Sequence, residues 1–229
     1  SFFPALRTNM HHRHVEAGAR MLQAGAWYRP AFYGDEPEQA IAEEVLQVRG
    51  GVGLIDVSTL GGIGVRGPDA AEFLNRVYTF AYAKQLAGTV RYALMTNEAG
   101  VVIDDGVVCR LEEQNFYVTA TTGGVDAVYR KMLQWNAQWR LQVTLLNLTN
   151  AYAGVNLAGP LSREVLEPLC DGIDLDKEAF PYLGVRQGTV AGIPSILLRV
   201  GFVGELGYEI HVPQHAGEAL WDALMQAGE

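Results

Sequence analysis

The 229-residue sequence has little cysteine, no long apolar run and fewer basic than acidic residues. Its two cysteines, Cys109 and Cys170, lie far apart and form neither a CxxC nor a zinc-ligand pattern, so a reducing, cytoplasmic compartment is expected. Seventeen Lys and Arg residues against 26 Asp and Glu residues give a net charge of −9, whereas phosphate binding requires a basic face. No apolar run approaches the ~20 residues that a membrane span requires. We therefore expect neither nucleic acid nor a membrane as a partner.

The composition is that of a folded chain. Hydrophobic residues make up 49% of the sequence, enough for the core of one large or two small domains, and 19% charged residues argue against disorder. The sequence begins at Ser1, with no initiating Met and no basic-then-apolar leader, from which we expect a processed chain or a fragment of a longer subunit.

A sequence repeat organises the chain. Residues 63–77 (IGVRGPDAAEFLNRV) have a counterpart 92 positions later (155 − 63 = 92), at residues 155–169 (VNLAGPLSREVLEPL). Each copy contains a short alternating strand, a Gly-Pro corner and an amphipathic helix, and continues as two or three strands and a further helix. We therefore predict an α+β fold with two related βαββαβ-like lobes. Ahead of the repeat, apolar spacing predicts helices over residues 15–28 and 38–49, the second closing at a glycine pair.

Residues 199–210 (RVGFVGELGYEI) carry a glycine at every third position between two strand-like runs. Glycine allows a positive φ and the close approach of a ligand. Two acids, Glu205 and Glu209, lie in this segment. One interpretation is a long hairpin connection with surface carboxylates, and the other is a turn that forms part of a ligand site.

A second unusual acid lies in the strand-like run 101–111 (VVIDDGVVCRL). Because side chains alternate along a strand, Asp105 shares its row with apolar residues only, whereas Asp104 falls on a mixed row. Desolvation would raise the pKa of Asp105, which is how a general acid or base is prepared. The alternative is a turn aspartate before Gly106, or a bulge that carries both acids into solvent.

Weaker patterns predict no further site. The glycines of residues 62–67 match GxGxxG, but they lie within a predicted strand and no acid follows about 20 residues on, so a dinucleotide site is not expected. Residues 11–14 (HHRH) lack a spacing that would converge three ligands on a metal, and we interpret these histidines, His211 and His215 as surface or packing residues. No Gly-x-Ser-x-Gly or paired Cys–His pattern supports a covalent nucleophile.

Several collinear motifs resemble the T-protein of the glycine cleavage system, a tetrahydrofolate-dependent aminomethyltransferase. They are RVGFVGELGYEI at 199–210, VVIDDG at 101–106, IDVS at 55–58, VRGPDA at 65–70 and NEAG at 97–100. The start of the chain, from MHHRHVEAG at 10–18 to WYRP at 27–30, is similar to the alpha subunit of heterotetrameric sarcosine oxidase, whose C-terminal part is a T-protein-like half. The resemblance covers essentially the whole chain. It implies one lobe formed by residues 1–60 plus 149–229 and a second by residues 61–148, around a central folate hole.

The resemblance assigns two acids to the site. Asp105 matches the family's central acid, which implies a role near N10 of the folate, in proton transfer or in stabilising an iminium cation. Glu209 matches the acid that holds the pterin, because a carboxylate can accept two parallel N–H bonds from the amidine-like edge of that ring.

The remaining site residues are expected to form the walls. Phe202 stands where the T-protein usually has Tyr, so stacking is retained and a hydroxyl is lost. Leu60 and Thr121 match positions that line the pocket. Cys109 stands where the T-protein has Tyr, so this contact departs from the family pattern. Glu205 is interpreted as a turn residue.

The implied reaction is one-carbon transfer. The expected domain captures the carbon of oxidised sarcosine, or of a similar methylated amine, as 5,10-methylenetetrahydrofolate, with other sarcosine oxidase-type subunits as partners and without a metal, FAD or NAD site. A tetrahydrofolate-dependent demethylase is one alternative. A non-catalytic folate-binding module that assists iron–sulfur assembly is another, but its KGCYxGQ-type motif is missing from the sequence.

The family pattern continues beyond the end of this sequence. It runs past a helix like the one expected at residues 218–226 into a segment with a folate-site arginine and then a small β-barrel domain. The sequence contains neither, so we expect the C-terminal barrel to be missing and the folate site to be incomplete in these 229 residues.

Overall fold

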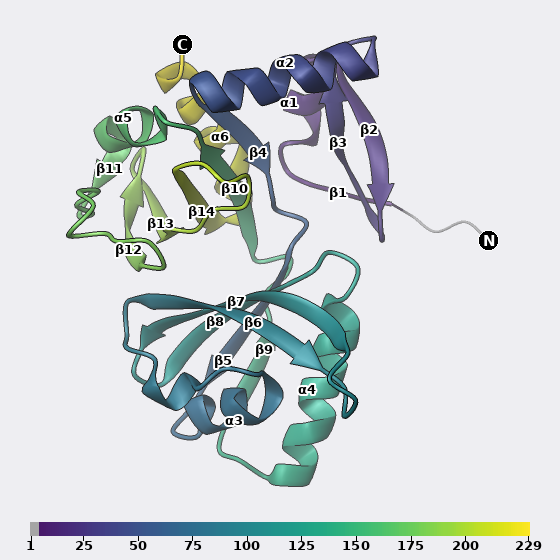
Figure 1. Cartoon of the computed structure of the whole chain (residues 1–229), viewed down its shortest axis with the longest axis vertical. Coiled ribbons are helices and arrows are strands. Elements are labelled where there is room, and N and C mark those ends of the chain that lie inside the picture. Colours follow the sequence, from purple (N-terminus) through teal and green to yellow (C-terminus); the bar gives the residue numbers. More distant parts are fainter. Residues whose placement is uncertain (1–4) are drawn as a thin grey trace. The chain divides into compact units, whose positions relative to one another are not determined.

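The computed structural model describes residues 5–229 (Figure 1), so the first four residues of the expected lobe 1–60 lie outside the described part. The chain divides into two compact units. Unit 1 consists of the described residues up to Thr59 together with Ala151–Tyr182 and Arg186–Glu229, and unit 2 of Leu60–Asn150 and Leu183–Val185. Within residues 5–229, no helix is both long enough and apolar enough to cross a membrane.

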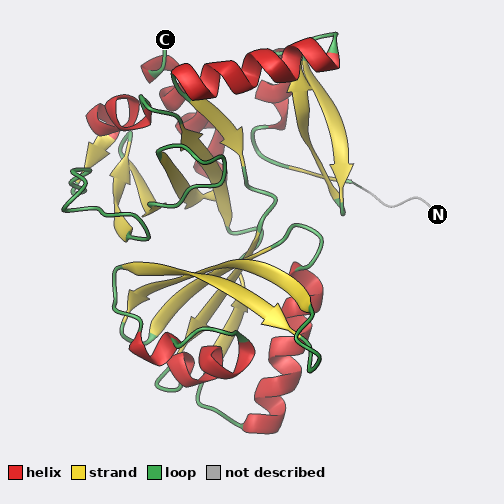
Figure 2. Ribbon diagram, in the orientation of Figure 1, coloured by secondary structure: helices red, strands yellow, loops and turns green. Residues whose placement is uncertain are grey.

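Unit 2 is built on a five-stranded sheet in the order β6-β7-β8-β5-β9. Its elements are β5 (Gly61–Arg66), α3 (Ala70–Val77), the 3-10 helix η1 (Tyr82–Lys84), β6 (Thr89–Thr96), β7 (Val102–Glu112), β8 (Asn115–Ala120), α4 (Val125–Trp139) and β9 (Thr144–Asn147). Helices α3 and α4 lie on one face of the sheet (Figure 2), where Phe73 and Met132 pack against Ile63 and Val65 of β5. Strand residues alternate between faces, so Gly62 and Gly64 of β5 lie on the opposite face of the sheet.

Unit 1 contains a six-stranded sheet in the order β11-β12-β13-β14-β10-β4. Its elements are β4 (Gly53–Asp56), β10 (Tyr152–Ala158), α5 (Ser162–Leu166), η2 (Glu167–Leu169), β11 (Cys170–Asp171), β12 (Val185–Val190), β13 (Ile193–Leu198), β14 (Gly207–Pro213), η3 (Gln214–Ala216) and α6 (Gly217–Ala227). Leu166 of α5 and Leu220 of α6 pack on the face formed by Leu157, Tyr208 and Ile210, so both helices cover the same side of this sheet.

The two sheets share the topology of four strands. The order β6-β7-β8-β5 in unit 2 is matched by β12-β13-β14-β10 in unit 1, and the next strand is β9, which follows α4, in unit 2 and β4, which precedes β10, in unit 1. Each copy has three such strands between its two helices, one more than a βαββαβ unit contains. The Gly-Pro corners are also alike, with φ of +135° at Gly67 and +133° at Gly159. A Cβ on either glycine would lie 2.3 Å from a backbone oxygen, that of Gln142 or Gly51 respectively, so both corners require glycine.

The N-terminal part of unit 1 differs from the prediction. Residues 15–28, expected as a helix, form the end of α1 (His11–Glu16), β2 (Ala19–Ala24) and the start of β3 (Trp27–Tyr33), so that prediction is wrong. Glycines with positive φ, Gly18 at +81° and Gly25 at +60°, stop the helix and turn the β2–β3 hairpin. Strand β1 (Leu6–Arg7) completes a three-stranded sheet, β1-β3-β2. The second predicted helix is confirmed as α2 (Pro37–Gly50).

A buried hydrogen-bond network connects this N-terminal part to β4. The Tyr33 hydroxyl donates to Nδ1 of His14 (2.9 Å), and Nε2 of His14 donates to Asp56 (3.0 Å). The Thr8 hydroxyl and the Ser58 amide also donate to the Asp56 carboxylate, at 2.6 and 2.9 Å. Burial opposes ionisation of Asp56, but these donors together lower its pKa below the usual value. His14 is fully buried and forms two hydrogen bonds, a role that its interpretation as a surface or packing residue did not include.

Candidate functional site

The two acids of β7 are placed opposite to expectation. Asp104 is buried, with 7% of its surface exposed, whereas Asp105 is exposed. The prediction that Asp105 is the desolvated acid is therefore wrong. Val101 and Ile103, which share its row, are 61% and 46% exposed, so that row begins in solvent. The mixed row that holds Asp104 instead faces the helices of unit 2, as the burial of Val108 in their core shows.

Asp104 holds the turn that precedes α4. Its carboxylate accepts hydrogen bonds from the backbone amide and the hydroxyl of Thr121, and a Cβ at Gly124 would lie 2.2 Å from its Oδ1. Burial raises the pKa of Asp104, the donors of Thr121 oppose that rise, and the neighbouring charge of Asp105 adds to it. The hydroxyl of Thr121, expected in the pocket wall, is thus engaged by Asp104. This arrangement is structural, because it fixes the turn that leads from β8 into α4.

The other residues predicted on unit 2 lie along the sheet face away from the helices. Asp105 and Cys109 are both on this face of β7, and Cys109 pairs in register with Tyr117 of β8. The Cys109 side chain is fully buried. Leu60 is half-buried and immediately precedes β5. Asp105 is the exposed carboxylate of this row.

The glycine-spaced segment 199–206 connects β13 to β14 and forms a hairpin loop in unit 1, as the first interpretation held. Gly204 has a φ of +81°, and the Arg199 guanidinium donates to the carbonyl of Gly207 at 3.0 Å. The Glu205 carboxylate accepts a 2.7 Å hydrogen bond from Arg49 on α2. Phe202 is 90% exposed. Its ring is therefore presented to solvent by a loop that is anchored on both sides.

Glu209 lies inside the sheet rather than in the turn. It pairs with Asn156 on β10 and with Leu198 on β13, and Asn156 pairs in turn with Ile55 on β4. These four residues form a row on the face opposite α5 and α6, because the alternate residues point into the core. The Glu209 side chain is only 9% exposed. A carboxylate this buried requires donors.

His211 supplies one of these donors. It lies two residues beyond Glu209 on the same face of β14, and its Nε2 is 2.7 Å from Oε1 of Glu209. The imidazole is 3% exposed. The sequence interpretation of His211 as a surface or packing residue missed this role, although the spacing of two on an alternating strand indicates that both side chains share a face.

Asn156 is the other polar residue of the row. It is 2% exposed, and neither Oδ1 nor Nδ2 has a hydrogen-bond partner within residues 5–229. Buried amides are normally paired, so both atoms are available to a ligand. A carboxylate beside an unpaired amide is complementary to a heterocycle edge with adjacent donors and acceptors, such as that of a pterin. The residues present therefore fit the group that the family resemblance implies.

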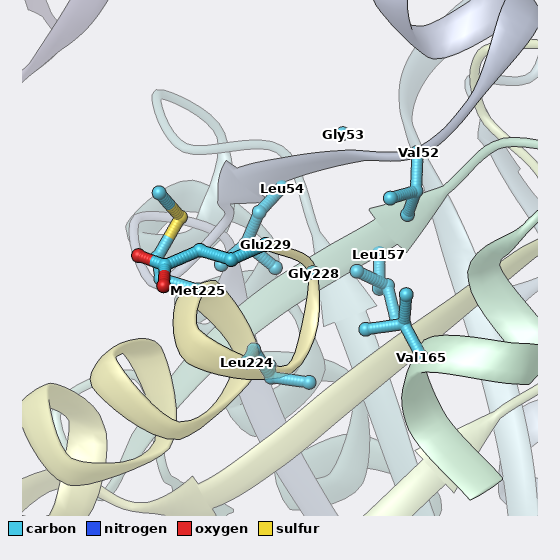
Figure 3. A pocket seen from close by; sticks show the side chains of 9 residues that line it. All are labelled: Val52, Gly53, Leu54, Leu157, Val165, Leu224, Met225, Gly228 and Glu229. Carbon is cyan, nitrogen blue, oxygen red and sulfur yellow. The ribbon is translucent and has the colours of Figure 1, made fainter.

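The opposite side of the same sheet holds an apolar pocket of about 170 Å³ (Figure 3). It lies among β4, β10, α5 and α6, and its lining residues are Val52, Gly53, Leu54, Leu157, Val165, Leu224, Met225, Gly228 and Glu229. Apart from Glu229, the side chains there offer no acid, base or hydrogen-bonding group. We assign no chemistry to this pocket. Within the described residues there is likewise no cluster of three or more His, Cys, Asp or Glu side chains that could hold a metal.

Comparison with known proteins identifies the family. The family model described as the GCVT N-terminal domain matches residues 10–229. The chain belongs to this family. Sarcosine oxidase subunit alpha from Corynebacterium sp. (strain P-1) is 39% identical over 232 residues, covering 99% of this chain and 24% of that protein. Aminomethyltransferase from Symbiobacterium thermophilum is 36% identical over 229 residues, covering 97% of this chain and 58% of that protein.

Solved structures agree with the family assignment. Glycine cleavage system aminomethyltransferase T from Bartonella henselae has a TM-score of 0.84 at 25% identity, covering 96% of this chain and 57% of its own. A chain of heterotetrameric sarcosine oxidase from Corynebacterium sp. U-96 has a TM-score of 0.60 at 22% identity, covering 83% of this chain and 91% of its own, and shows the fold alone. The resemblance inferred from the motifs and the mixed α/β fold are thereby confirmed. The chain spans about a quarter of the length of the sarcosine oxidase alpha subunits, and 58% of that aminomethyltransferase.

Proposed function

We propose that this GCVT-family domain binds tetrahydrofolate and transfers a one-carbon unit to it, capturing the carbon of an oxidised N-methyl amine of the sarcosine type as 5,10-methylenetetrahydrofolate. Bound tetrahydrofolate supplies the N5 and N10 amines that accept the carbon. The names of the relatives, a sarcosine oxidase alpha subunit and an aminomethyltransferase, support this substrate class. The similarity to the sarcosine oxidase alpha subunit also supports the proposal that this domain is part of a larger subunit, which assembles with sarcosine oxidase-type partner subunits.

The observation that carries the proposal is the buried carboxylate of Glu209. At 9% exposure it is held by His211 and lies opposite an amide with no internal partner. The T-protein resemblance implies that Glu209 is the acid that holds the pterin. Glu209 is proposed to accept hydrogen bonds from the amidine-like edge of the pterin, a charge-assisted pairing that also fixes the orientation of the ring.

The other predicted residues are given roles within this proposal. Asp105, the exposed carboxylate of β7, is proposed to assist proton transfer at the transferred carbon or to stabilise positive charge that develops there. Phe202, exposed on its loop, is proposed to stack on the ligand. Leu60, Thr121 and Cys109 are proposed as residues of the site wall. The Thr121 hydroxyl is hydrogen-bonded to Asp104 and the Cys109 side chain is fully buried, so these two are proposed to support the wall from behind its surface.

The product distinguishes the reactions that this domain could carry out. The full-length protein is incubated with tetrahydrofolate and either formaldehyde, or sarcosine together with oxygen and the amine-oxidising partner subunits, and the folate products are separated by chromatography. Sarcosine- or formaldehyde-dependent formation of 5,10-methylenetetrahydrofolate, above the rate without enzyme, supports the proposal. Formation of 5-methyltetrahydrofolate would instead identify a demethylase. Binding without any product would identify a folate-binding module.

A further inference from the structure

The amide of Asn156 is unusual among the buried polar groups of the chain. Three other side chains of residues 5–229 have one buried atom without a partner, in His11, Gln85 and Asn136. The two amides among them keep a partner at their other atom, because Nε2 of Gln85 donates to two carbonyls and Nδ2 of Asn136 donates to Val143. Asn156 has no partner at either atom within the described residues. Because such a group is destabilising in the folded state, its presence in the centre of a sheet calls for a function.

The fold itself does not require an amide at this position. Position 64, the repeat counterpart of Asn156 (156 − 92 = 64), is a glycine that pairs with Tyr117 on β8, just as Asn156 pairs with Glu209 on β14. The same strand, pairing and topology are therefore built with no side chain there. The Asn156 amide is therefore explained by a function of unit 1 and not by a requirement of its fold.

The neighbours of Asn156 along its own strand are small. They are Gly154 and Ala158 on the same face of β10, and Gly207 on β14 lies opposite Ala158. Directly opposite Asn156 is Glu209. Side chains at directly opposed positions are within about 5.5 Å at Cβ, so one ring system can contact both groups.

On the basis of the proposed function, we propose that Asn156 recognises the reduced state of the pterin ring. When Glu209 accepts from the 2-amino group and N3–H, the adjacent edges of the ring present O4 beside N5 and N1 beside N8. In a tetrahydropterin N5 and N8 each carry a hydrogen, so either edge offers one acceptor and one donor. The Asn156 amide, with Nδ2 as donor and Oδ1 as acceptor, matches such a pair completely.

An oxidised pterin cannot satisfy the same amide. In folic acid N5 and N8 carry no hydrogen, so both edges offer only acceptors, and Oδ1 of Asn156 would be buried against a lone pair. A site that hydrogen-bonds a donor rejects the analogue that lacks it, because its buried polar group is left unpaired. Dihydrofolate retains N8–H and lacks N5–H. It therefore reports which edge the amide contacts.

The test is the ratio of affinities for tetrahydrofolate and folic acid in the full-length protein, measured by calorimetry under anaerobic, reducing conditions. We expect Asn156→Leu and Asn156→Ala to bind tetrahydrofolate about tenfold more weakly and folic acid with little change, so that the ratio collapses. Dihydrofolate should follow tetrahydrofolate if the amide contacts N8–H, and folic acid if it contacts N5–H. Without ligand, Asn156→Leu should melt at the same temperature as the wild type or higher, because it removes an unpaired amide.

The matched control is Asn136→Leu on α4. It removes an amide that does donate, to the carbonyl of Val143, so it should lower the melting temperature and leave the affinity ratio unchanged. An unchanged ratio in both Asn156 variants overturns the inference while tetrahydrofolate binding by the wild type still supports the proposed function. A wild type that binds no folate overturns both.

Discussion

Nε2 of His211 lies 2.7 Å from Oε1 of Glu209, two residues away on the same face of β14. The histidine thus holds one oxygen of a nearly buried carboxylate within the fold. A carboxylate held in this way is oriented before a ligand arrives, which reduces the entropic cost of binding. The pair gives Glu209 a defined geometry that an isolated surface acid lacks.

Removing the Glu209 carboxylate should weaken tetrahydrofolate binding. We expect Glu209→Ala to cost roughly 1–3 kcal/mol, the price of leaving ligand donors unpaired. Calorimetry on the full-length protein measures the difference. Glu205→Ala is the matched control, since Glu205 lies nearby in sequence but is paired with Arg49 at the surface, and its loss should leave affinity unchanged. Equal affinity in Glu209→Ala and the wild type would remove Glu209 from the site.

His211 should act through Glu209 and not through the ligand. His211→Leu removes the donor and should weaken tetrahydrofolate binding by about 1.5–3 kcal/mol, as expected for a hydrogen bond to a charged group. His211→Gln retains an N–H donor and should recover most of that loss. In the Glu209→Ala background the His211→Leu substitution should have almost no further effect. Additive losses in the double variant would contradict the positioning role.

Part of this arrangement could be predicted from the sequence. The repeat, with Gly67 and Gly159 at equivalent corners, indicates two copies of one supersecondary unit, and the motif around Glu209 identifies the family. The prediction of a helix over residues 15–28 was wrong because apolar spacing over so short a segment is weak evidence for a helix. Gly18 and Gly25 adopt a positive φ and turn the chain there instead.

The polar row could not be predicted in the same way. Strand alternation places Glu209 and His211 on one face, but the partner of Glu209 depends on the register between β10 and β14, which are separated by about 50 residues in the chain. Strand alternation likewise puts Asp104 and Asp105 on opposite faces of β7, but it does not predict which of the two faces the helices cover. Tertiary packing of α3 and α4 decides that question.

The buried network around Asp56 should make unit 1 sensitive to acid. The pKa of Asp56 is lowered in the folded state, so the unfolded chain binds its proton more readily. Its contribution to stability is therefore present above the ordinary carboxyl pKa and is lost as pH falls through the lowered folded value. We expect Asp56→Ala to be destabilised at neutral pH by about 3–5 kcal/mol, the usual cost of breaking a buried pair, and to lose less further stability in acid than the wild type.

Denaturant titrations between neutral and acidic pH measure this behaviour. Asp222→Ala is the control, because Asp222 forms an exposed ion pair with Arg13 on the same helix α1 that carries His14. Exposed pairs contribute little to stability, so its pH profile should parallel that of the wild type. A wild-type acid response retained in full by Asp56→Ala would show that other groups cause it.

The adjacent acids of β7 should separate into a catalytic and a structural residue. Asp105→Asn should lower turnover by about 10²–10⁴-fold, the range for a general acid or base, with a much smaller change in tetrahydrofolate affinity. Asp104→Asn should leave turnover within about twofold of the wild type, because it contributes through the fold and not to the transition state. Single-turnover rates and calorimetry on the two variants give both quantities. Equal turnover in Asp105→Asn and the wild type would remove its proposed role.

Asp104→Asn should instead alter the pH dependence of stability. Because the pKa of Asp104 is raised in the folded state, the folded protein retains its proton to higher pH than the unfolded chain, and this contribution to stability declines as pH rises from the ordinary carboxyl value through the raised one. The asparagine keeps an acceptor for Thr121 and does not ionise, so the decline should disappear. Asp105→Asn removes a neighbouring charge that raises the pKa of Asp104, and should only reduce the decline. A larger effect of Asp105→Asn than of Asp104→Asn on this profile would reverse the assignment of the buried acid.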